Sequence, residues 1–281
     1  MRRQYELAGK SESTVVNYSR CLAQMALHFG CCPSELDKEQ VLDYLQYLKN
    51  LHKTPSESYF KHTVYGLRAL YKLYGLEDKH FVLPSIREPK KLPVVLSQSE
   101  VKRLISAPKL LKHRMLIALS YDCGLRRGEL LNLEVKDIDF DRKMLHIRQG
   151  KGRKDRYVPV GDLTLRGLKT YLETENPTLY LFYRRTAQGE VVRYSASAVR
   201  FVLNQAKKHA GLQKHVTSHT LRHSYATHLL EMGLDIVSLR DALGHSSIET
   251  TMMYLHISRI GRQTTFSPLD RVYEYALNPK K

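Results

Sequence analysis

The chain lacks the features that would indicate a membrane, secreted or zinc-binding protein. No apolar run approaches the roughly 18–20 residues that cross a bilayer, and the opening MRRQYELAGK has no signal-peptide core. The four cysteines form no CxxC pair, so neither a disulfide framework nor a zinc ribbon is indicated. These absences predict a soluble, cytoplasmic protein with reduced thiols and no membrane partner.

Acidic side chains are scarce relative to basic ones. The 45 Lys and Arg outnumber the 28 Asp and Glu, which gives a formal net charge of +17. Residues 1–90 hold 13 basic and 10 acidic side chains, net +3, whereas residues 91–281 hold the other 32 and 18, net +14. Such a surplus is typical of proteins that bind nucleic acid. The total alone would also suit a basic ribosomal or membrane-surface protein.

At 281 residues, the chain is long enough for two globular domains. Apolar residues recur at helical spacing over 11–30, a second helix is expected to follow Pro33 and run to about Asn50, and the capping pattern TPSE at 54–57 predicts a third. These helices predict an N-terminal helical domain. Three prolines and several basic residues then cluster in LPSIREPKKLPVVL, which predicts a linker.

A second domain is expected to open at Ser97, which forms a capping-box pattern with Glu100. Residues 143–160, KMLHIRQGKGRKDRYVPV, hold two strand-like runs around a Gly/Lys/Arg-rich turn and predict a β-hairpin with a cationic tip. Helices are predicted over 98–107, 109–122, 126–133, 162–173, 195–210 and 219–255, the last broken at Gly233 and Gly244.

The stretch HTLRHSYATH, residues 219–228, concentrates basic side chains. On a helix, His219, Arg222 and His223 would lie on neighbouring faces. A metal site would pair His219 with His223, but the motif lacks the glutamate of the zincins, and no further carboxylate or cysteine ligand lies nearby. We therefore predict no metal. His223 and His228 lie among apolar neighbours and are expected to be satisfied buried or supporting histidines.

Two arginines suit phosphate chemistry better. Arg222 is one, and Arg126, which follows a Gly-Leu turn in DCGLRRGELLNLE, is the other. A guanidinium offers a planar fork of donors that matches two phosphate oxygens and stays charged when desolvated. Two such groups around one phosphate would neutralise a phosphorane-like transition state without a metal. Arg127 is expected to be a solvated surface charge.

Four segments, in this order and spacing, resemble the tyrosine recombinases, also called phage-integrase-type recombinases. They are GLRRGEL (124–130), GKGRKDRYVPV (150–160), HTLRHSYATHLL (219–230) and LGHSSIETTMMYLH (243–256). The resemblance is strong over about 98–256 and looser in the N-terminal domain. It implies a catalytic set made of Arg126, Lys151, His219, Arg222, His245 and Tyr254.

The resemblance also implies the role of each residue. Tyr254 would attack a DNA phosphodiester and form a 3′-phosphotyrosyl intermediate, with release of a 5′-hydroxyl. The two arginines would clamp the non-bridging oxygens. His219 would act as acid and base near the tyrosine, His245 would donate to the phosphate, and Lys151 would protonate the leaving 5′-oxygen, with Lys154 as a weaker rival. Neither ATP nor another cofactor is implied, and the chain has no phosphate-binding GxxxxGK[ST] loop.

The implied fold is mainly α with a small β-hairpin or sheet, arranged as a two-domain, C-shaped DNA clamp. Residues 1–86 would form a helical core DNA-binding domain, 87–96 a linker, and 97–281 a mixed α/β catalytic domain with a C-terminal tail helix. The partners would be double-stranded recombination sites and other copies of the chain, as a homotetramer that exchanges its tails. The tail could equally pack on its own domain.

Two other functions stay open. A type IB topoisomerase-like nicking and closing enzyme shares the chemistry but rejoins the same strand. A helix-turn-helix DNA-binding protein without catalysis would also suit residues 226–255. Within the recombinases, the compact span before HTLRH argues against an integron integrase. The absence of an arm-binding domain before residue 11 argues against the larger phage integrases. A Xer-like resolvase or a simple mobile-element recombinase is favoured.

Overall fold

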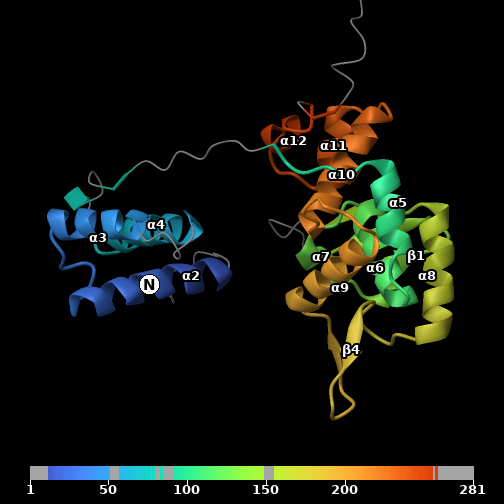
Figure 1. Cartoon of the computed structure of the whole chain (residues 1–281), viewed down its shortest axis with the longest axis horizontal. Helices are drawn as coiled ribbons and strands as arrows, with labels where there is room; N and C mark the ends of the chain where they lie inside the picture. Colours follow the sequence, from blue (N-terminus) through green and yellow to red (C-terminus); the bar gives the residue numbers. More distant parts are fainter. Residues whose placement is uncertain are drawn as a thin grey trace, which may run out of the picture. The chain divides into compact units, whose positions relative to one another are not determined.

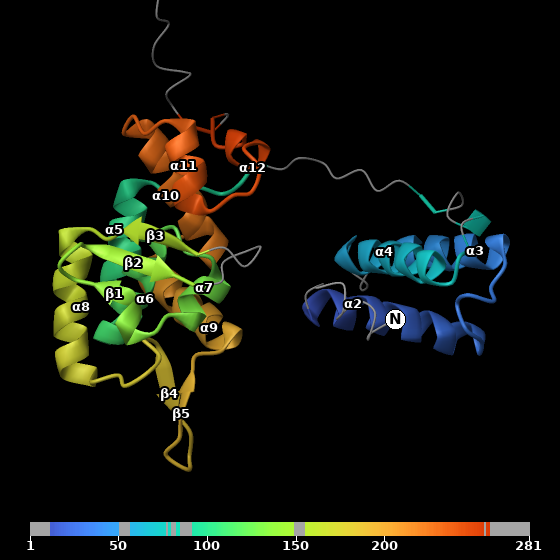
Figure 2. The ribbon, with the colours of Figure 1, turned by 180° about the vertical axis from the view of Figure 1, so that it is seen from behind.

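The computed structural model describes residues 12–50, 57–76, 78–79, 83–84, 92–148, 155–255 and 257–258. By its internal contacts the chain divides into two compact units, Met1–Lys90 and Lys91–Lys281. In both units most of the described residues are helical, and the strands are short (Figure 1, Figure 2). The prediction of a mainly α protein with small β elements is confirmed. No helix among the described residues is long and apolar enough to cross a membrane.

Three helices make up most of the described part of the first unit: α2 (Glu12–Phe29), α3 (Lys38–Asn50) and α4 (Glu57–Leu73). Their apolar faces share one core, with Met25, Val64 and Leu67 fully buried in it. The first predicted helix is confirmed. The predicted cap residues 54–56 lie outside the described residues.

The second helix follows Pro33 and ends at Asn50, as predicted. It starts at Lys38, because Asp37 and Gln40 cap it reciprocally. The Asp37 backbone N–H donates to Gln40 Oε1 (3.0 Å), and the Gln40 N–H donates to Asp37 Oδ1 (2.9 Å). These two bonds satisfy amides that have no carbonyl partner within the helix, so the first turn forms there.

The second unit is built from short helices around a small sheet. The predicted capping box is present at its first helix, where Ser97 Oγ accepts from the Glu100 N–H (3.2 Å) and a Glu100 carboxylate oxygen accepts from the Ser97 N–H (2.7 Å). The helices are α5 (Gln98–Ser106), α6 (Leu111–Asp122), α7 (Arg127–Asn132), the 3-10 turn η2 (Val135–Asp137), α8 (Asp162–Glu175), α9 (Ala196–His209), α10 (Ser218–Glu231), α11 (Ile236–Leu243) and α12 (Glu249–Met252).

The predicted hairpin is confirmed in its two strands. β2 (Met144–Ile147) pairs antiparallel with β3 (Arg156–Pro159), and β1 (Ile138–Asp139) adds a third strand on the far side of β2. Its tip, residues 149–154, lies outside the described residues. A second hairpin was not predicted: β4 (Tyr183–Arg185) pairs with β5 (Val191–Arg193) and extends from the unit at the end opposite α11 and α12 (Figure 1, Figure 2).

Helix α10 is the central element of the second unit. Most of its side chains are buried, and it packs against α6 and α11. Leu221 belongs to the main core with the sheet and α6, whereas Tyr225 and Leu230 belong to a smaller cluster that includes Tyr254. A helix enclosed on several sides has a well-fixed position, so the polar residues of α10 are held firmly as well.

Candidate active site

The first two turns of α10 carry three polar residues of HTLRH, and the start of the helix is fixed by a cap. Thr217 Oγ1 accepts from the Thr220 N–H (3.1 Å), and the Thr217 N–H donates to Thr220 Oγ1 (3.1 Å). Beyond this cap, His219 is exposed, Arg222 is buried and His223 is half-buried. The cap fixes where α10 begins, and it therefore fixes the positions along the helix from which the three side chains project.

Arg222 lies inside the unit, where backbone carbonyls surround its guanidinium. It donates to Gly124 O (2.6 Å) and to Leu243 O (2.5 Å), and its side chain is 4% exposed. Burial, together with the nearby positive charge of Arg126, lowers the pKa of Arg222 to about 10. The guanidinium stays protonated at neutral pH, so its positive charge lies against these two carbonyl oxygens.

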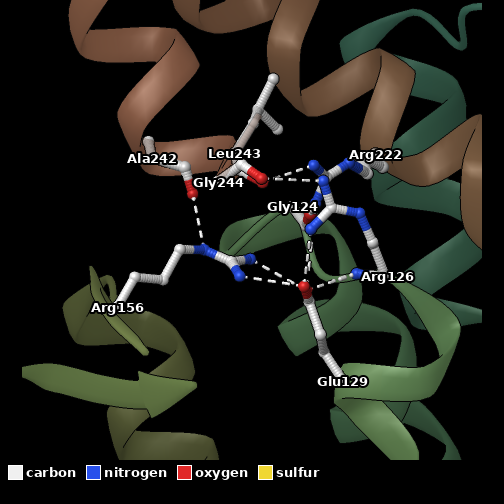
Figure 3. Close-up of polar contacts among 8 residues, drawn as sticks. All are labelled: Gly124, Arg126, Glu129, Arg156, Arg222, Ala242, Leu243 and Gly244. Carbon is white, nitrogen blue, oxygen red and sulfur yellow. Dashed lines mark hydrogen bonds and ion pairs between the residues drawn. The ribbon is translucent and has the colours of Figure 1, made fainter. Parts of the chain in front are cut away.

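The guanidinium of Arg126 binds the same turn of the chain as that of Arg222. Arg126 precedes α7 and donates to Gly244 O (3.0 Å) and to Glu129 Oε1 (2.8 Å). Gly244 follows Leu243, the acceptor of Arg222, so the two guanidinium groups meet at one turn of the chain (Figure 3). The two arginines predicted to share a phosphate are thus brought together.

One carboxylate balances these cations, and sequence reasoning missed it. Glu129, on α7, receives two hydrogen bonds from Arg156 of β3, at 2.9 Å to Oε1 and 2.8 Å to Oε2 (Figure 3). Burial alone would raise the pKa of Glu129, but the bonds and charges of Arg156 and Arg126 outweigh it and lower that pKa to about 2. Three guanidinium groups, of Arg126, Arg156 and Arg222, therefore face one ionised carboxylate.

Two glycines form turns whose carbonyls accept hydrogen bonds from Arg222 and Arg126. Gly124 (φ +56°) and Gly244 (φ +61°) both adopt the left-handed conformation. A Cβ on Gly124 would lie 2.6 Å from Cε1 of Tyr225, and a Cβ on Gly244 would lie 3.1 Å from Cδ of Arg156. The sequence signal for Glu129 and for the turn at Gly124 is the short motif GLRRGEL, which places a glycine two residues before Arg126 and the glutamate three residues after it.

Tyr254 follows α12 and is almost completely buried, with 1% of its surface exposed. Its hydroxyl oxygen lies 3.0 Å from Nδ1 of His223, and the two ring centroids are 5.6 Å apart. Burial raises the pKa of the phenol, and the positive charges of Arg222 and Arg126 oppose that rise. The phenol thus belongs to the same electrostatic neighbourhood as the arginine pair.

The two histidines that were predicted to be buried or supporting have different surroundings. His228 is buried, and its Nδ1 lies 2.7 Å from the Tyr121 hydroxyl, as expected of a satisfied core histidine. His223 is only half-buried, and its partner is the Tyr254 hydroxyl. Burial, followed by the charges of His219 and Arg222, lowers the pKa of His223 to about 4, so it is neutral at physiological pH.

Of the remaining predicted site residues, the structure describes the two histidines but neither lysine. Partial burial and then the charges of Arg222, Arg127 and Arg126 lower the pKa of His219, whose ring centroid lies 6.3 Å from that of His223. Nδ1 of His245 lies 2.9 Å from Oγ1 of Thr251, one turn before Tyr254. Lys151 and Lys154, on the hairpin tip, lie outside the described residues.

No metal site is evident in the described part of the chain. It contains no group of three or more His, Cys, Asp or Glu side chains arranged to hold a metal ion. His219 and His223 are near each other, but His223 already contacts Tyr254. What the arrangement can do chemically is hold an anion against two guanidinium groups beside a phenol.

Comparisons with known proteins agree with this chemistry. Residues 94–259 match the phage integrase family, and residues 1–79 match the phage integrase N-terminal SAM-like domain. The chain is 33% identical over 257 residues to tyrosine recombinase XerA of Pyrococcus horikoshii, covering 90% of this chain and 86% of that protein. It is 36% identical over 202 residues to tyrosine recombinase XerD of Staphylococcus saprophyticus, covering 68% and 67%.

Solved structures show the same fold. A crystal structure of XerA recombinase aligns over 99% of this chain and 96% of that chain, with a TM-score of 0.53 and 29% identity. A lambda integrase dimer bound to a COC′ core site aligns over 95% of each chain, with a TM-score of 0.69 and 19% identity. With both parts of the chain matched and a relative above 30% identity over most of its length, the chain belongs to the phage integrase family and is a site-specific tyrosine recombinase.

Proposed function

We propose that Tyr254 attacks a phosphodiester of a DNA recombination site, releases a 5′-hydroxyl and becomes joined to the 3′-phosphate. The observation that carries this proposal is the position of the phenol, which is buried within the electrostatic reach of both Arg222 and Arg126. An anionic phosphate drawn to the two guanidinium groups would lie beside the hydroxyl oxygen. The energy of the broken bond is kept in the phosphotyrosyl link until a second 5′-hydroxyl attacks.

The arginines would stabilise the transition state by charge. The attacked phosphorus gains negative charge on its non-bridging oxygens, and two forked donors in a water-poor site neutralise it better than solvent does. In the free protein these donors bind Gly124 O, Leu243 O and Gly244 O. The phosphate oxygens would replace at least some of these carbonyls, so the donors need no new direction to receive the substrate.

Other residues would manage protons and hold the phosphate. We assign acid and base action on the tyrosine side to His219 and a hydrogen bond to the phosphate to His245. Thr251 would support the latter by holding the His245 ring through its contact with Nδ1, at 2.9 Å. Lys151 is assigned as the acid that protonates the leaving 5′-oxygen.

DNA is the proposed partner, and both parts of the chain would contact it. Residues 1–86 would act as a core DNA-binding domain, 87–96 as a linker and 97–281 as the catalytic domain, closing around the duplex as a C-shaped clamp. Support comes from the net charge of +17 and from similar proteins whose structures contain DNA. XerH has been solved bound to its difH substrate, and lambda integrase bound to a core site.

The biological setting is proposed at the level of a class. The relatives include XerA and XerD recombinases and a putative integrase, so a Xer-like resolvase or a mobile-element recombinase fits best. Such an enzyme would act in the cytoplasm, where the DNA is. It would work as a homotetramer on two DNA sites, with the C-terminal tail of one copy docked on the next.

The experiment is to trap the covalent intermediate. The full chain is incubated with a library of duplexes nicked near the cleavage point, so that the short 5′-hydroxyl fragment diffuses away and religation is prevented. A protein–DNA adduct that survives denaturation is expected for the wild type, and sequencing of its DNA identifies the target. Tyr254→Phe should bind the same DNA and form no adduct. Absence of an adduct with the wild type on every substrate would refute the proposal.

A further inference from the structure

The contact between His223 and Tyr254 has no role in the proposed set of catalytic residues. Among the residues that the structure describes, the hydrogen-bond partner of the Tyr254 hydroxyl is Nδ1 of His223, at 3.0 Å. Tyr254 is buried, so its hydroxyl proton does not point into bulk water. In the tautomer with its proton on Nε2, the neutral imidazole accepts the hydroxyl proton at Nδ1.

We propose that His223 is the general base of the cleavage step and accepts the hydroxyl proton of Tyr254 while the phenol attacks phosphorus. This inference rests on the proposed function and refines the acid–base role given there to His219. His223 qualifies as catalytic because its Nδ1 touches the oxygen that reacts. A base within hydrogen-bond distance of the proton it removes satisfies the geometric condition for general base catalysis.

His219 is less well placed for the first proton transfer. Its side chain is exposed, whereas that of His223 is half-buried and lies against Tyr254. The two imidazole rings are neighbours, with centroids 6.3 Å apart. His219 is therefore suited to exchange protons between this pair and solvent, one step after the proton has left the phenol.

The electrostatic surroundings keep His223 ready to accept. Its pKa is lowered to about 4, by burial first and then by the charges of His219 and Arg222, so the imidazole is neutral at neutral pH and one of its two ring nitrogens is unprotonated. A phosphate bound between Arg126 and Arg222 brings negative charge to the same neighbourhood. That charge offsets the cations and raises the basicity of His223 when the substrate is present.

Groups that already have a proposed role account for every bond and every proton of this step. The O–H bond of Tyr254 breaks and an N–H bond forms at His223 Nδ1, while the phenolic oxygen forms its bond to phosphorus. The bond from phosphorus to the 5′-oxygen breaks, and that oxygen takes a proton from a primary ammonium group, the role proposed for Lys151. In rejoining, the His223 imidazolium returns its proton to the departing phenolate.

The test measures single-turnover cleavage of the trapped target duplex by the full chain. His223→Gln keeps a polar side chain but cannot take up the proton, and cleavage should slow about 100-fold or more, within the range for general base catalysis. DNA affinity and melting temperature should stay near the wild-type values. Replacing Tyr254 by a ring-fluorinated tyrosine, whose proton leaves more easily, should then restore His223→Gln about tenfold.

His219→Gln, one turn earlier on the same helix, is the matched control. Fluorinated tyrosine should help it much less than it helps His223→Gln. A His223→Gln variant that cleaves at the wild-type rate, or a rescue confined to His219→Gln, overturns the inference. Both outcomes leave the proposed function intact, because they require a wild type that forms the covalent adduct.

A second measurement needs no variant. Nitrogen-15 NMR of the histidine rings in the DNA-free wild type reports which ring nitrogen bears the proton, and His223 is assigned through its contact with the Tyr254 ring. Nδ1 should be unprotonated near neutral pH, with the proton on Nε2. A protonated Nδ1 would mean that the histidine donates to the phenol, and His223 could not be the base.

Discussion

At the scale of single residues, the central feature is that one carboxylate holds the arginines. Glu129 binds the guanidinium of Arg156 through both oxygens. It also holds Arg126 through both, because Oε1 accepts from the Arg126 guanidinium and Oε2 from the Arg126 backbone N–H, and Oε2 lies 3.9 Å from Nη1 of Arg222. Without this anion, three guanidinium groups would repel one another in a poorly hydrated place. The orientation of the arginines toward Leu243 and Gly244 therefore depends on a residue that need not touch the substrate.

The pKa of Glu129 makes this dependence measurable. Its value falls from an ordinary 4.5 to about 2 on folding, so the unfolded chain binds a proton more tightly than the folded one. The resulting contribution, about 3 kcal/mol, is fully present above pH 4.5 and is lost as the pH falls toward 2. Urea unfolding across this range should show Glu129→Gln to be less stable at neutral pH and less sensitive to acid than the wild type.

Glu173→Gln, an exposed position on α8, removes the same charge far from the arginines and serves as the control. It should keep the acid sensitivity of the wild type. An unchanged pH profile in Glu129→Gln would show that this carboxylate does not stabilise the fold through its ionised form.

At the scale of elements, the site is assembled at helix ends. Arg126 precedes α7, Gly124 follows α6, Gly244 ends α11 and Tyr254 follows α12. Helix ends expose carbonyls and amides that have no partner within the helix, and the arginines use several of these carbonyls. Small changes in how a helix ends should therefore alter the site.

Two glycines with the same local structure test this point. Gly124 after α6 and Gly211 after α9 have φ of +56° and +64°, and each helix end is closed by the same pair of backbone hydrogen bonds. Gly211→Ala should cost about 1 kcal/mol, since only the left-handed backbone is penalised. Gly124→Ala should cost at least about 3 kcal/mol, because its Cβ would also overlap the ring of Tyr225.

Thermal and urea denaturation measure both glycine variants, and cleavage assays show whether the damage reaches the site. Gly124→Ala should slow cleavage more than its lost stability explains, because the Gly124 carbonyl binds Arg222. Equal losses of stability in the two variants would contradict the close contact with Tyr225.

Helix caps give a second element-scale prediction. Thr217→Ala and Ser195→Ala each remove a side chain that accepts a hydrogen bond from the third residue of its helix, α10 or α9. Each should cost about 1 kcal/mol. Only Thr217→Ala should also slow DNA cleavage, because α10 carries Arg222 and His223. Equal cleavage rates in the two variants would argue that the α10 cap does not position the site.

The elements also show what the sequence could predict. Helical periodicity and the capping box at Ser97 predicted the main helices and the start of α5. The β4–β5 hairpin was missed because its strands have three residues each and expose much of their surface, so no clear alternation of apolar residues marks them. His223 was expected to be buried or supporting because its partner is 31 positions away, a contact created only by the packing of α10 against the α12 end.

At the scale of the whole molecule, the charge is divided unequally between the two compact units. Residues 1–90 carry net +3 and residues 91–281 net +14. Each phosphate that is neutralised on binding releases counterions, so the affinity for DNA should fall steeply with salt. The dissociation constant for a target duplex should rise about 1,000-fold or more between 50 and 200 mM salt. A nearly flat salt dependence, measured by fluorescence anisotropy, would contradict an extensive phosphate interface.

The arginine cluster has a consequence for how such a protein can evolve. Arg126, Arg156 and Arg222 together carry three positive charges against the single negative charge of Glu129, and the pKa of Arg222 is lowered partly by Arg126. The excess positive charge that would attract a phosphodiester also destabilises the DNA-free protein, because the guanidinium groups repel one another. Substitutions that remove one of these charges should raise the stability of the fold and lower the rate of cleavage. An increase in thermal stability that keeps the activity should therefore come from substitutions outside this cluster.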